Sequence, residues 1–425
     1  MKRLSLSLAC LSLASSLSGW AQTGSPLPRA ARPEDEGFSS SRLARIDSLI
    51  QPIVTGGQLP GAVVFLMRNG RVVLHKAYGY RDVATRAPLL GNDIFRIASQ
   101  SKAITSLAVM MLWEEGRFGL DDPIERYIPE FAKPTVLTRF NPADSTWTAE
   151  PARRSITIRH LLTHTSGIDY AGIGSDDFKA IYAKAGIPSG IGNDRFTIGE
   201  KMRLLGKLPL KHQPGERFTY SLSLDVLGYF VEVVSGMPFD RFLRTRIFDP
   251  LGMQDTWFYL PPDRATRLVT LHEGDSGKVI PRRGRVFDNV NPDYPSLRGT
   301  YFSGGAGLSG TVEDYARFLQ LFLNGGELNG VRLLSPRTVG MMLIDQLPTL
   351  SNDFGLGFGL ETAANDHQSP RGIGSFTWGG AFSTSYWADP KEQLVALVYT
   401  NTFSVPAAGV LGGRFPALVY AALIR

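Results

Sequence analysis

The spacing of apolar residues predicts an opening helix followed by a pair of strands. Apolar positions between residues 43 and 50 recur at the 3.6-residue spacing of a helix, and serines just before them can cap it. Two apolar runs follow at residues 62–67 and 72–77, separated by Asn69-Gly70, the dipeptide that favours a two-residue type I′ turn. We therefore predict an amphipathic helix and then an antiparallel β-hairpin.

Helical spacing dominates the middle of the chain, and strand patterns return near its end. The expected helices cover residues 99–116, 158–162, 198–205, 222–235, 239–247, 313–322 and 415–423, and the expected late strands lie around residues 376, 386–387 and 394–399. No internal period of about 20 to 50 residues indicates a repeat array. Because the strands come first and last, we expect the two chain ends to share one sheet.

The predicted fold class is therefore α+β, an antiparallel sheet built from both chain ends and flanked by helices, with a helical lobe inserted in the middle. We expect the α/β part to cover about residues 33–120 and 301–425, and the lobe about residues 121–300. Both parts belong to one expected domain over residues 22–425.

The first 21 residues have the pattern of a secretory signal peptide. Two basic residues at positions 2 and 3 precede an apolar stretch, and small residues at positions 19 and 21 suit a cleavage site. We expect cleavage after Ala21, a mature chain that starts at Gln22, and a periplasmic or secreted protein. The single cysteine, Cys10, lies in this leader, so a disulfide, a zinc–thiolate site and a cysteine nucleophile are excluded from the mature chain.

Composition and charge place the chain among globular proteins and exclude several partners. Of its 425 residues, 43% are hydrophobic and 20% are charged, which excludes a disordered chain. The net charge of +6 includes two positives of the leader, and the other basic pairs are isolated, so we expect no nucleic-acid partner. After the leader, no stretch approaches the roughly 18 apolar residues of a transmembrane segment.

Two common hydrolase sites are missing from the sequence. No serine completes the Gly-x-Ser-x-Gly turn of the α/β-hydrolases, and the histidines show no His-Glu-x-x-His spacing. His160 and His164 lie one helical turn apart, as a pair of metal ligands would, but Thr165-Ser166-Gly167 ends any helix there. We interpret both histidines as structural, and we expect no metal and no cofactor.

One Ser-x-x-Lys motif, at Ser99 and Lys102, occurs in the chain, and it lies at the start of a predicted helix. Residues at positions i and i+3 share one helix face, so the lysine can reach the serine hydroxyl. A serine needs a base to become a nucleophile, and a lysine with a pKa of about 10.4 must be tuned by its surroundings to serve as one. The motif by itself is common by chance in chains of this length.

Four further ordered motifs accompany it. The set consists of residues 95–102 (Phe-Arg-Ile-Ala-Ser-Gln-Ser-Lys), 156–167 (Ile-Thr-Ile-Arg-His-Leu-Leu-Thr-His-Thr-Ser-Gly), Tyr220-Ser221, 250–253 (Pro-Leu-Gly-Met) and 304–308 (Gly-Gly-Ala-Gly-Leu). Together they closely resemble the serine β-lactamase-like family, which includes class C β-lactamases, D-alanyl peptidases and family VIII carboxylesterases. The resemblance spans about residues 33–425.

This resemblance implies roles for particular residues. Ser99 would be the acylated nucleophile and Lys102 its base partner, while Tyr220 would share in proton transfer and later activate water. Whether Lys102 or Tyr220 takes the serine proton stays open. The family's third element, on an edge strand, matches Trp378-Gly379-Gly380-Ala381, whose glycines let the backbone approach a substrate closely. The N–H groups of Ala381 and Ser99 would form the oxyanion hole.

Two departures from the family pattern favour esters as substrates. Leu222 replaces the asparagine of Tyr-x-Asn, whose amide commonly holds a lactam or a peptide, and Trp378 replaces a cationic or imidazole residue. A substrate carboxylate therefore lacks its partner at Trp378, whereas a neutral ester needs none. Core packing is the alternative role for Trp378. A second Tyr-x-Asn, at Tyr399 and Asn401, ends a Val- and Leu-rich run, and we interpret it as structural.

The sequence thus predicts a secreted serine hydrolase working through an acyl-enzyme, and most specifically a carboxylesterase on short or hydrophobic acyl esters. The alternative within this chemistry is a β-lactamase, or a D-amino-acid peptidase or amidase. A catalytically inactive ligand-binding protein of the cell envelope is a further alternative, which the intact Ser99, Lys102 and Tyr220 disfavour. The expected partner is a small-molecule ester or amide substrate.

Overall fold

The structure is a computed structural model that describes residues 26–192, 195–287 and 289–425. The expected leader over residues 1–21, with Cys10 and the cleavage site before Gln22, lies outside the described residues. The strands are β1 Gly61–Arg68, β2 Arg71–Asp82, β3 Ala87–Pro88, β4 Phe95–Arg96, β5 Thr135–Asn141, β6 Thr146–Pro151, β7 His272–Asp275, β8 Lys278–Pro281, β9 Ser309–Gly310, β10 Glu327–Leu328, β11 Val331–Arg332, β12 Gly359–Leu360, β13 Phe376–Gly380, β14 Thr384–Asp389, β15 Leu394–Tyr399 and β16 Thr402–Phe403. The helices are α1 Ser40–Thr55, α2 Ser101–Glu114, α3 Ile158–Leu162, α4 Asp176–Ala185, α5 Ile198–Leu205, α6 Ser223–Ser235, α7 Phe239–Leu243, α8 Asp249–Leu251, α9 Pro262–Ala265, α10 Val312–Leu323, α11 Pro336–Met342 and α12 Pro406–Ala421.

The main sheet joins the two ends of the chain, as predicted. Its order is β12-β13-β14-β15-β1-β2-β3, and every adjacent pair is antiparallel. The β1–β2 hairpin turns at Asn69 (φ 50°) and Gly70 (φ 74°), the two positive φ values of a type I′ turn. On its other side β1 pairs with β15, with Val63 opposite Tyr399, so the first strand and the last long strand lie side by side.

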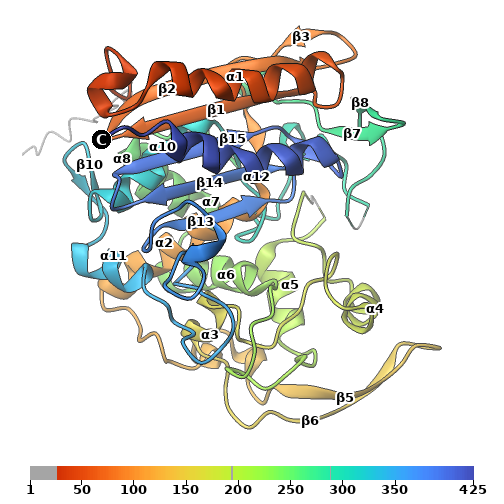
Figure 1. Ribbon diagram of the computed structural model, residues 1–425. Coiled ribbons are helices and arrows are strands. Elements are labelled where there is room, and N and C mark those ends of the chain that lie inside the picture. The colour runs from red at the N-terminus through yellow and green to blue at the C-terminus, as the bar shows by residue number, and fades with distance from the viewer. Residues whose placement is uncertain (1–25, 193–194, 288) are drawn as a thin grey trace, which may run out of the picture.

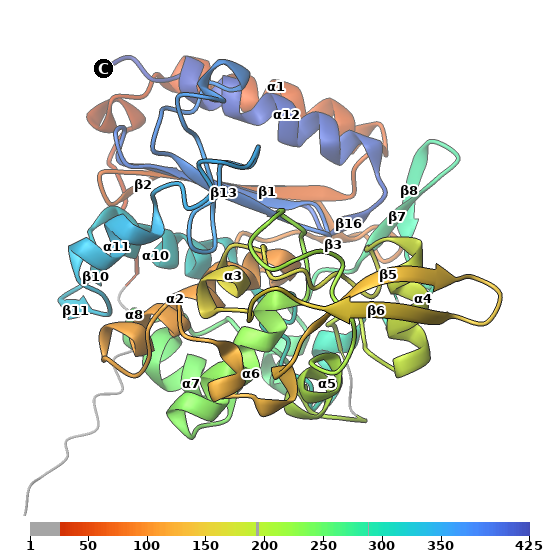
Figure 2. The same cartoon turned by 90° about the horizontal axis from the view of Figure 1, so that it is seen from below.

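Helices cover both faces of this sheet, which explains why β1 is buried from Gly61 to Met67 (Figure 1). Alternate residues of a strand point to opposite faces. Val63, Phe65 and Met67 belong to the large core that also contains α2 and α10, whereas the intervening Val64 and Leu66 belong to a second core under α1 and α12. Figure 2 shows α1 and α12 packed side by side on one face, with the helices of the middle segment on the other.

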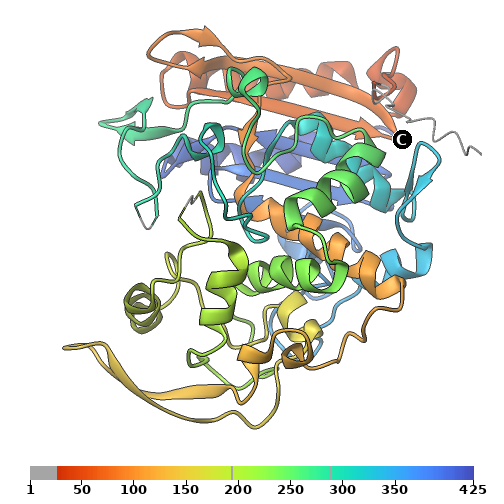
Figure 3. The ribbon, with the colours of Figure 1, turned by 180° about the vertical axis from the view of Figure 1, so that it is seen from behind.

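The middle segment contains strands as well as the predicted helices. Two of the expected helices, α3 and α5, have the predicted bounds. The hairpin of β5 and β6 was not predicted, because most of its residues are polar and exposed and so give no alternating apolar pattern. It projects from the lobe, away from the main sheet (Figure 3). The β7–β8 hairpin was missed for the same reason.

Several helices differ from the prediction. The stretch expected over residues 239–247 divides into α7, a π-helical turn at Arg244–Phe248 and α8. The last helix, α12, begins at Pro406 rather than near residue 415, since glycines and Pro416 weaken its helical signal while packing against α1 stabilises it. The sequence prediction also missed α4, α9 and α11. Among the described residues, no helix is long and apolar enough to cross a membrane.

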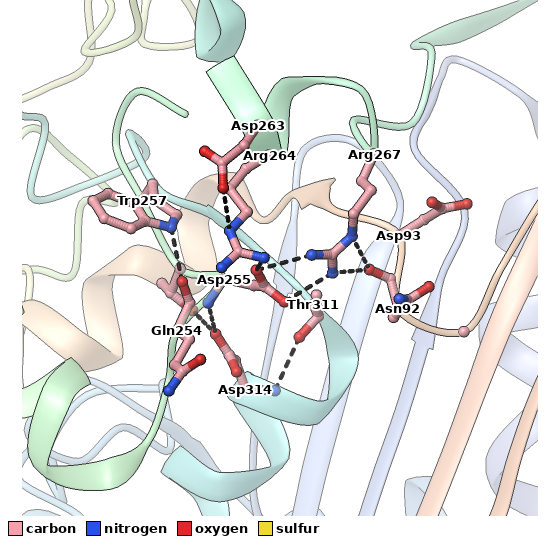
Figure 4. A network of polar contacts seen from close by, with 12 residues as sticks. Asn92, Asp93, Gln254, Asp255, Trp257, Asp263, Arg264, Arg267, Thr311 and Asp314 are labelled. Carbon is pink, nitrogen blue, oxygen red and sulfur yellow. Dashed lines mark hydrogen bonds and ion pairs between the residues drawn. The ribbon is translucent and has the colours of Figure 1, made fainter. Parts of the chain in front are cut away.

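A buried polar network ties α10 to the segment before α9 (Figure 4). The Asp314 carboxylate on α10 accepts hydrogen bonds from the backbone N–H of Asp255 (2.8 Å) and the hydroxyl of Thr256 (2.9 Å). Asp255 in turn pairs with Arg264 and Arg267. Burial raises the pKa of Asp314 to about 7, so this carboxyl is costly to ionise in the folded protein.

Candidate active site

Ser99 lies in a short turn between a strand and a helix. Strand β4 leads into the 3₁₀ turn Ala98–Gln100, and α2 begins at Ser101. Ala98 has a φ of 44°, the left-handed region that costs a non-glycine residue free energy, so backbone strain sits directly before the serine. Between Asp93 and Leu112, all of which the structure describes, every residue except Ser99 is buried. The turn therefore presents this one hydroxyl toward solvent.

The end of β15 holds this turn from both sides. Asn401 accepts a hydrogen bond from the Arg96 backbone N–H (3.0 Å) and donates one to the Arg96 carbonyl (3.2 Å). The Tyr399 hydroxyl donates to the side-chain carbonyl of Gln100 at 2.5 Å. The second Tyr-x-Asn of the sequence is thus structural, as interpreted, and it brackets Ser99.

Lys102 reaches Ser99 from the first turn of α2, as the motif predicts. Its side chain is 3% exposed, and its Nζ lies 3.5 Å from the Ser99 Oγ. The same nitrogen donates a 2.7 Å hydrogen bond to the carbonyl of Gly305. It also lies over the rings of Tyr220 (4.5 Å from the centroid) and Tyr170 (5.4 Å). Lys102 is therefore fixed by a carbonyl and two aromatic faces within reach of the serine.

The Gly304–Leu308 motif forms the loop against which α2 rests. The Thr105 hydroxyl donates to the Gly304 carbonyl (2.7 Å), and the Leu308 N–H donates to the Ser101 hydroxyl (3.0 Å). A Cβ at Gly304 would lie 2.3 Å from a backbone oxygen of Leu224, so the loop can approach α6 only without a side chain there. These contacts therefore hold the Gly304–Leu308 loop in the position where its Gly305 carbonyl binds Lys102.

Tyr220 lies directly before α6 with its ring against Lys102. Its ring stacks on Tyr170 (5.7 Å between centroids, 22°) and contacts Trp378 (5.7 Å) and His164 (4.9 Å). Its hydroxyl oxygen is buried and has no hydrogen-bond partner among the described residues. The structure thus brings Ser99, Lys102 and Tyr220 together, with the face of the tyrosine rather than its hydroxyl toward the ammonium nitrogen.

His164 holds the segment around Tyr220 in place. Its carbonyl accepts the Thr219 N–H (2.7 Å), and its Nδ1 lies 3.1 Å from the Ser221 hydroxyl. Burial, and then the charge of Lys102, keep the pKa of His164 well below its usual range, so the ring is neutral. His160 instead accepts the Thr157 N–H at 3.2 Å and caps α3. In the described part of the chain, no group of His, Cys, Asp or Glu residues could hold a metal ion.

The Trp378–Ala381 segment lies beside the Ser99 turn. Strand β12 pairs only with Phe376 and Thr377, so no strand among the described residues pairs with Trp378, Gly379 and Gly380 on that side. A Cβ at Gly380 would lie 2.4 Å from the Ile97 carbonyl oxygen, so β13 touches the turn at a position that only glycine allows. Ala381 follows as an exposed residue of the turn into β14. The predicted third element therefore reaches the nucleophile segment.

Trp378 and Leu222, the two departures from the family pattern, have different surroundings. Trp378 is partly buried, and its ring contacts Tyr220 and Phe354 (5.3 Å). Leu222 is fully buried in the large core, and its N–H donates to the Asp169 carbonyl. The Leu222 side chain has no exposed surface, so the expected substrate contact there finds no support in the structure.

Sequence reasoning missed two residues of the site, Tyr170 and Asp225. Asp225 is fully buried, and burial raises its pKa to about 6. Its sequence signal is one carboxylate in the otherwise uncharged start of α6. Tyr170 gives no such signal, since its approach to Lys102 depends on tertiary packing alone.

Comparison with known proteins agrees with this geometry. Residues 46–420 match the Beta-lactamase family. The chain is 32% identical over 415 residues to Esterase EstB of Burkholderia gladioli, covering 92% of this chain and 99% of EstB. It is 35% identical over 385 residues to Protein Rv1367c of Mycobacterium tuberculosis, covering 86% and 92% of the two chains.

The fold is also similar to a solved structure. EstCE1, described as a hydrolase with promiscuous acyltransferase activity, superposes with a TM-score of 0.77 at 28% sequence identity, over 91% of this chain and 99% of EstCE1. The match covers both the sheet built from the chain ends and the segment between them. The chain therefore belongs to the β-lactamase family, with the α+β fold of β-lactamases and transpeptidases, and is a serine hydrolase of that family.

Proposed function

We propose that this protein is a carboxylesterase that cleaves short or hydrophobic acyl esters through an acyl-enzyme on Ser99. One observation carries the proposal. The Oγ of the accessible Ser99 lies 3.5 Å from the Nζ of the buried Lys102, and the contacting rings of Tyr220 and Trp378 lie beside them. The name Esterase EstB supports the same substrate class, and the description of EstCE1 as a hydrolase with promiscuous acyltransferase activity supports acyl transfer.

The proposed reaction has two halves. Ser99 Oγ forms a bond to the acyl carbon while its proton passes to Lys102, and the ester C–O bond then breaks as the proton is returned to the leaving alcohol. Water, activated by Lys102 and Tyr220, hydrolyses the acyl-enzyme and regenerates the serine. The N–H groups of Ser99 and Ala381 would stabilise the negative oxygen formed in each half, a contribution of about 10² to 10³ in rate per donor.

The aromatic rings of Tyr220 and Trp378 favour neutral esters over substrates that carry a carboxylate. A carboxylate placed against Trp378 loses water without gaining a cationic partner, which costs several kcal/mol. The indole instead offers an apolar face and one N–H donor to an acyl or alcohol group.

The test is turnover of p-nitrophenyl butyrate beside mass spectrometry of a slowly turned-over acyl donor. We expect the adduct on the peptide that bears Ser99 and a loss of more than about a hundredfold in kcat for Ser99→Ala. The matched control is Ser106→Ala, which removes a buried hydroxyl of α2, the helix that follows Ser99, with no hydrogen-bond partner among the described residues. An adduct on another residue, or nitrocefin turnover equal to ester turnover, would refute the proposal.

We also propose that the protein is exported and matures at Gln22. The support is the leader pattern of basic, apolar and small residues at positions 2–21. Amino-terminal sequencing of the protein recovered from the periplasm or medium should begin at Gln22. A cytoplasmic product that still begins at Met1 would refute export.

A further inference from the structure

Asp225 is a buried carboxylate that the proposed reaction does not yet use. It lies in the first turn of α6, five positions after Tyr220, and is 0% exposed. The Tyr301 hydroxyl donates to its Oδ1 at 3.3 Å, whereas its Oδ2 has no hydrogen-bond partner among the described residues. A buried anion without full compensation is costly, so its presence needs a reason.

The Asp225 Oδ2 and the Lys102 Nζ border the same space next to Gly305. The point where a Cβ of Gly305 would sit lies 2.6 Å from the Asp225 Oδ2 and 3.5 Å from the Lys102 Nζ. Gly190 leaves a similar opening, since its Cβ would lie 3.3 Å from the same oxygen. Gly305 thus keeps a side chain out of the gap between the carboxylate and Lys102, and Gly190 leaves room beside the carboxylate.

The other groups facing the carboxylate are neutral or donors. They are Tyr170 from the loop after α3, Tyr301 and Ser303 from the segment before α10, and the backbone N–H of Gly305. Lys102, from α2, is the cation among the groups that lower the pKa of Asp225. Burial opposes them and raises that pKa to about 6, which leaves the carboxylate ionised above that pH.

We propose that Asp225 is the anionic partner of Lys102, a positioning residue whose carboxylate stabilises the ammonium that Lys102 becomes when it takes the proton of Ser99. This inference rests on the proposed function, because it requires Ser99 as nucleophile and Lys102 as the group that receives the proton. The role resembles that of the aspartate beside the histidine in a Ser-His-Asp triad, which stabilises the imidazolium without itself accepting the proton.

The physical consequence is a change in how the reaction at Ser99 depends on pH. A nearby anion favours the charged form of an amine, so the carboxylate stabilises the product of the proton transfer from Ser99 to Lys102. Removing the anion should therefore lower both the pH at which the reaction at Ser99 reaches its plateau and the plateau rate. A residue that merely packs the lobe would change the rate without moving that pH.

The experiment measures the rate at which a fluorophosphonate labels Ser99 between pH 5 and pH 10. In this step the Ser99 Oγ–P bond forms, the P–F bond breaks, fluoride leaves and the hydroxyl proton passes to Lys102. For Asp225→Asn we expect the midpoint of the rise with pH to move down by about one unit, and the plateau rate to fall about tenfold. Asp314→Asn is the control, because it removes another buried carboxylate of raised pKa that lies in the separate network of Figure 4, and its midpoint should match the wild type.

Each outcome has a defined meaning. A wild-type protein whose Ser99 is not labelled at any pH would remove the proposed function, and the inference with it. Normal wild-type labelling combined with an unchanged midpoint in Asp225→Asn would overturn the inference alone.

A second measurement does not require Asp225→Asn to fold. Linkage is reciprocal, so Lys102→Met should raise the titration midpoint of the Asp225 carboxyl. NMR of protein labelled with ¹³C-aspartate would measure this midpoint. An Asp225 midpoint that is the same with and without the Lys102 charge would overturn the inference.

Discussion

Lys102 donates a 2.7 Å hydrogen bond from its Nζ to the carbonyl of Gly305, a residue 203 positions away in the sequence. The same nitrogen is 3.5 Å from the Ser99 hydroxyl, so the loop holds the lysine more closely than the nucleophile does. An amine nitrogen can donate this hydrogen bond with or without the extra proton, so the carbonyl can keep holding Lys102 while the nitrogen takes the serine proton. The geometry of the resting site therefore depends on a loop that the Ser-x-x-Lys motif does not contain.

We predict that Lys102 and Tyr220 act as one proton-transfer unit. Lys102→Ala and Tyr220→Phe should each lower kcat by about 10² to 10⁴, since each removes a group that moves a proton in the transition state. The double variant should lose little beyond the worse single variant. Steady-state kinetics with p-nitrophenyl butyrate would measure the cycle, and fully additive losses would contradict the coupling.

The control for this cycle is Tyr229→Phe, which removes a phenol on the same helical lobe. Its hydroxyl accepts a hydrogen bond from Arg203 at 3.4 Å on the exposed side of α6. We expect its kcat to stay within about threefold of the wild type, because exposed hydrogen bonds contribute little.

Gly380→Ala should impair catalysis by separating β13 from the Ser99 turn. The added Cβ would lie 2.4 Å from the Ile97 carbonyl oxygen and 2.3 Å from the Thr384 hydroxyl, so the strand must move. We expect kcat to fall at least about tenfold and the free energy of unfolding to drop by about 1 to 3 kcal/mol.

Gly409→Ala in α12 is the matched control for that substitution. Nothing lies within 4 Å of its Cβ position, and alanine is favoured over glycine inside a helix by about 0.5 to 1 kcal/mol. Its stability should therefore rise slightly at unchanged kcat, as urea titration and ester turnover would show. Equal activity of both alanine variants would contradict the close contact of β13 with the turn.

Trp378→Lys should narrow the preference for esters over lactams. In the wild type we expect kcat/KM for p-nitrophenyl butyrate to exceed that for nitrocefin by at least about a hundredfold, or roughly 2.7 kcal/mol. The lysine offers the lactam carboxylate a cation and removes apolar surface from the ester. Trp378→Phe keeps an apolar ring and should leave the ratio nearly unchanged. A ratio unaffected by Trp378→Lys would mean that this position does not select the substrate.

Asp314→Asn should stabilise the protein increasingly as the pH rises. Burial raises the pKa of Asp314 from its usual value near about 4 to about 7, so the folded state binds this proton more tightly than the unfolded state. The wild type therefore loses stability as the pH rises through this window, and the penalty is complete above about pH 7. The variant, which cannot ionise, escapes a cost on the order of a few kcal/mol.

Urea unfolding of both proteins at pH 5 and pH 8 measures this difference. The control is Asp176→Asn, since the Asp176 side chain is 100% exposed and its substitution should show no comparable pH dependence. A stability difference for Asp314→Asn that is the same at both pH values would show that the carboxyl ionises freely in the folded state.

Local features of the sequence determined those parts of the structure that depend on near neighbours. Asn69-Gly70 fixed a hairpin because its two positive φ values suit few other residues, and apolar spacing placed α3 and α5 correctly. The Ser-x-x-Lys spacing likewise brought Ser99 and Lys102 to one helical turn. The ordered motifs identified the family, which the comparison confirmed.

Only the tertiary structure decided what surrounds that pair. The polar β5–β6 hairpin had no alternating pattern to predict it, and α12 forms over a Gly-rich stretch because packing on α1 outweighs weak propensity. Asp225, Tyr170 and the Gly305 carbonyl reach Lys102 from distant parts of the chain. Their effect on charge depends on burial and on distances between elements, which residue order alone does not encode.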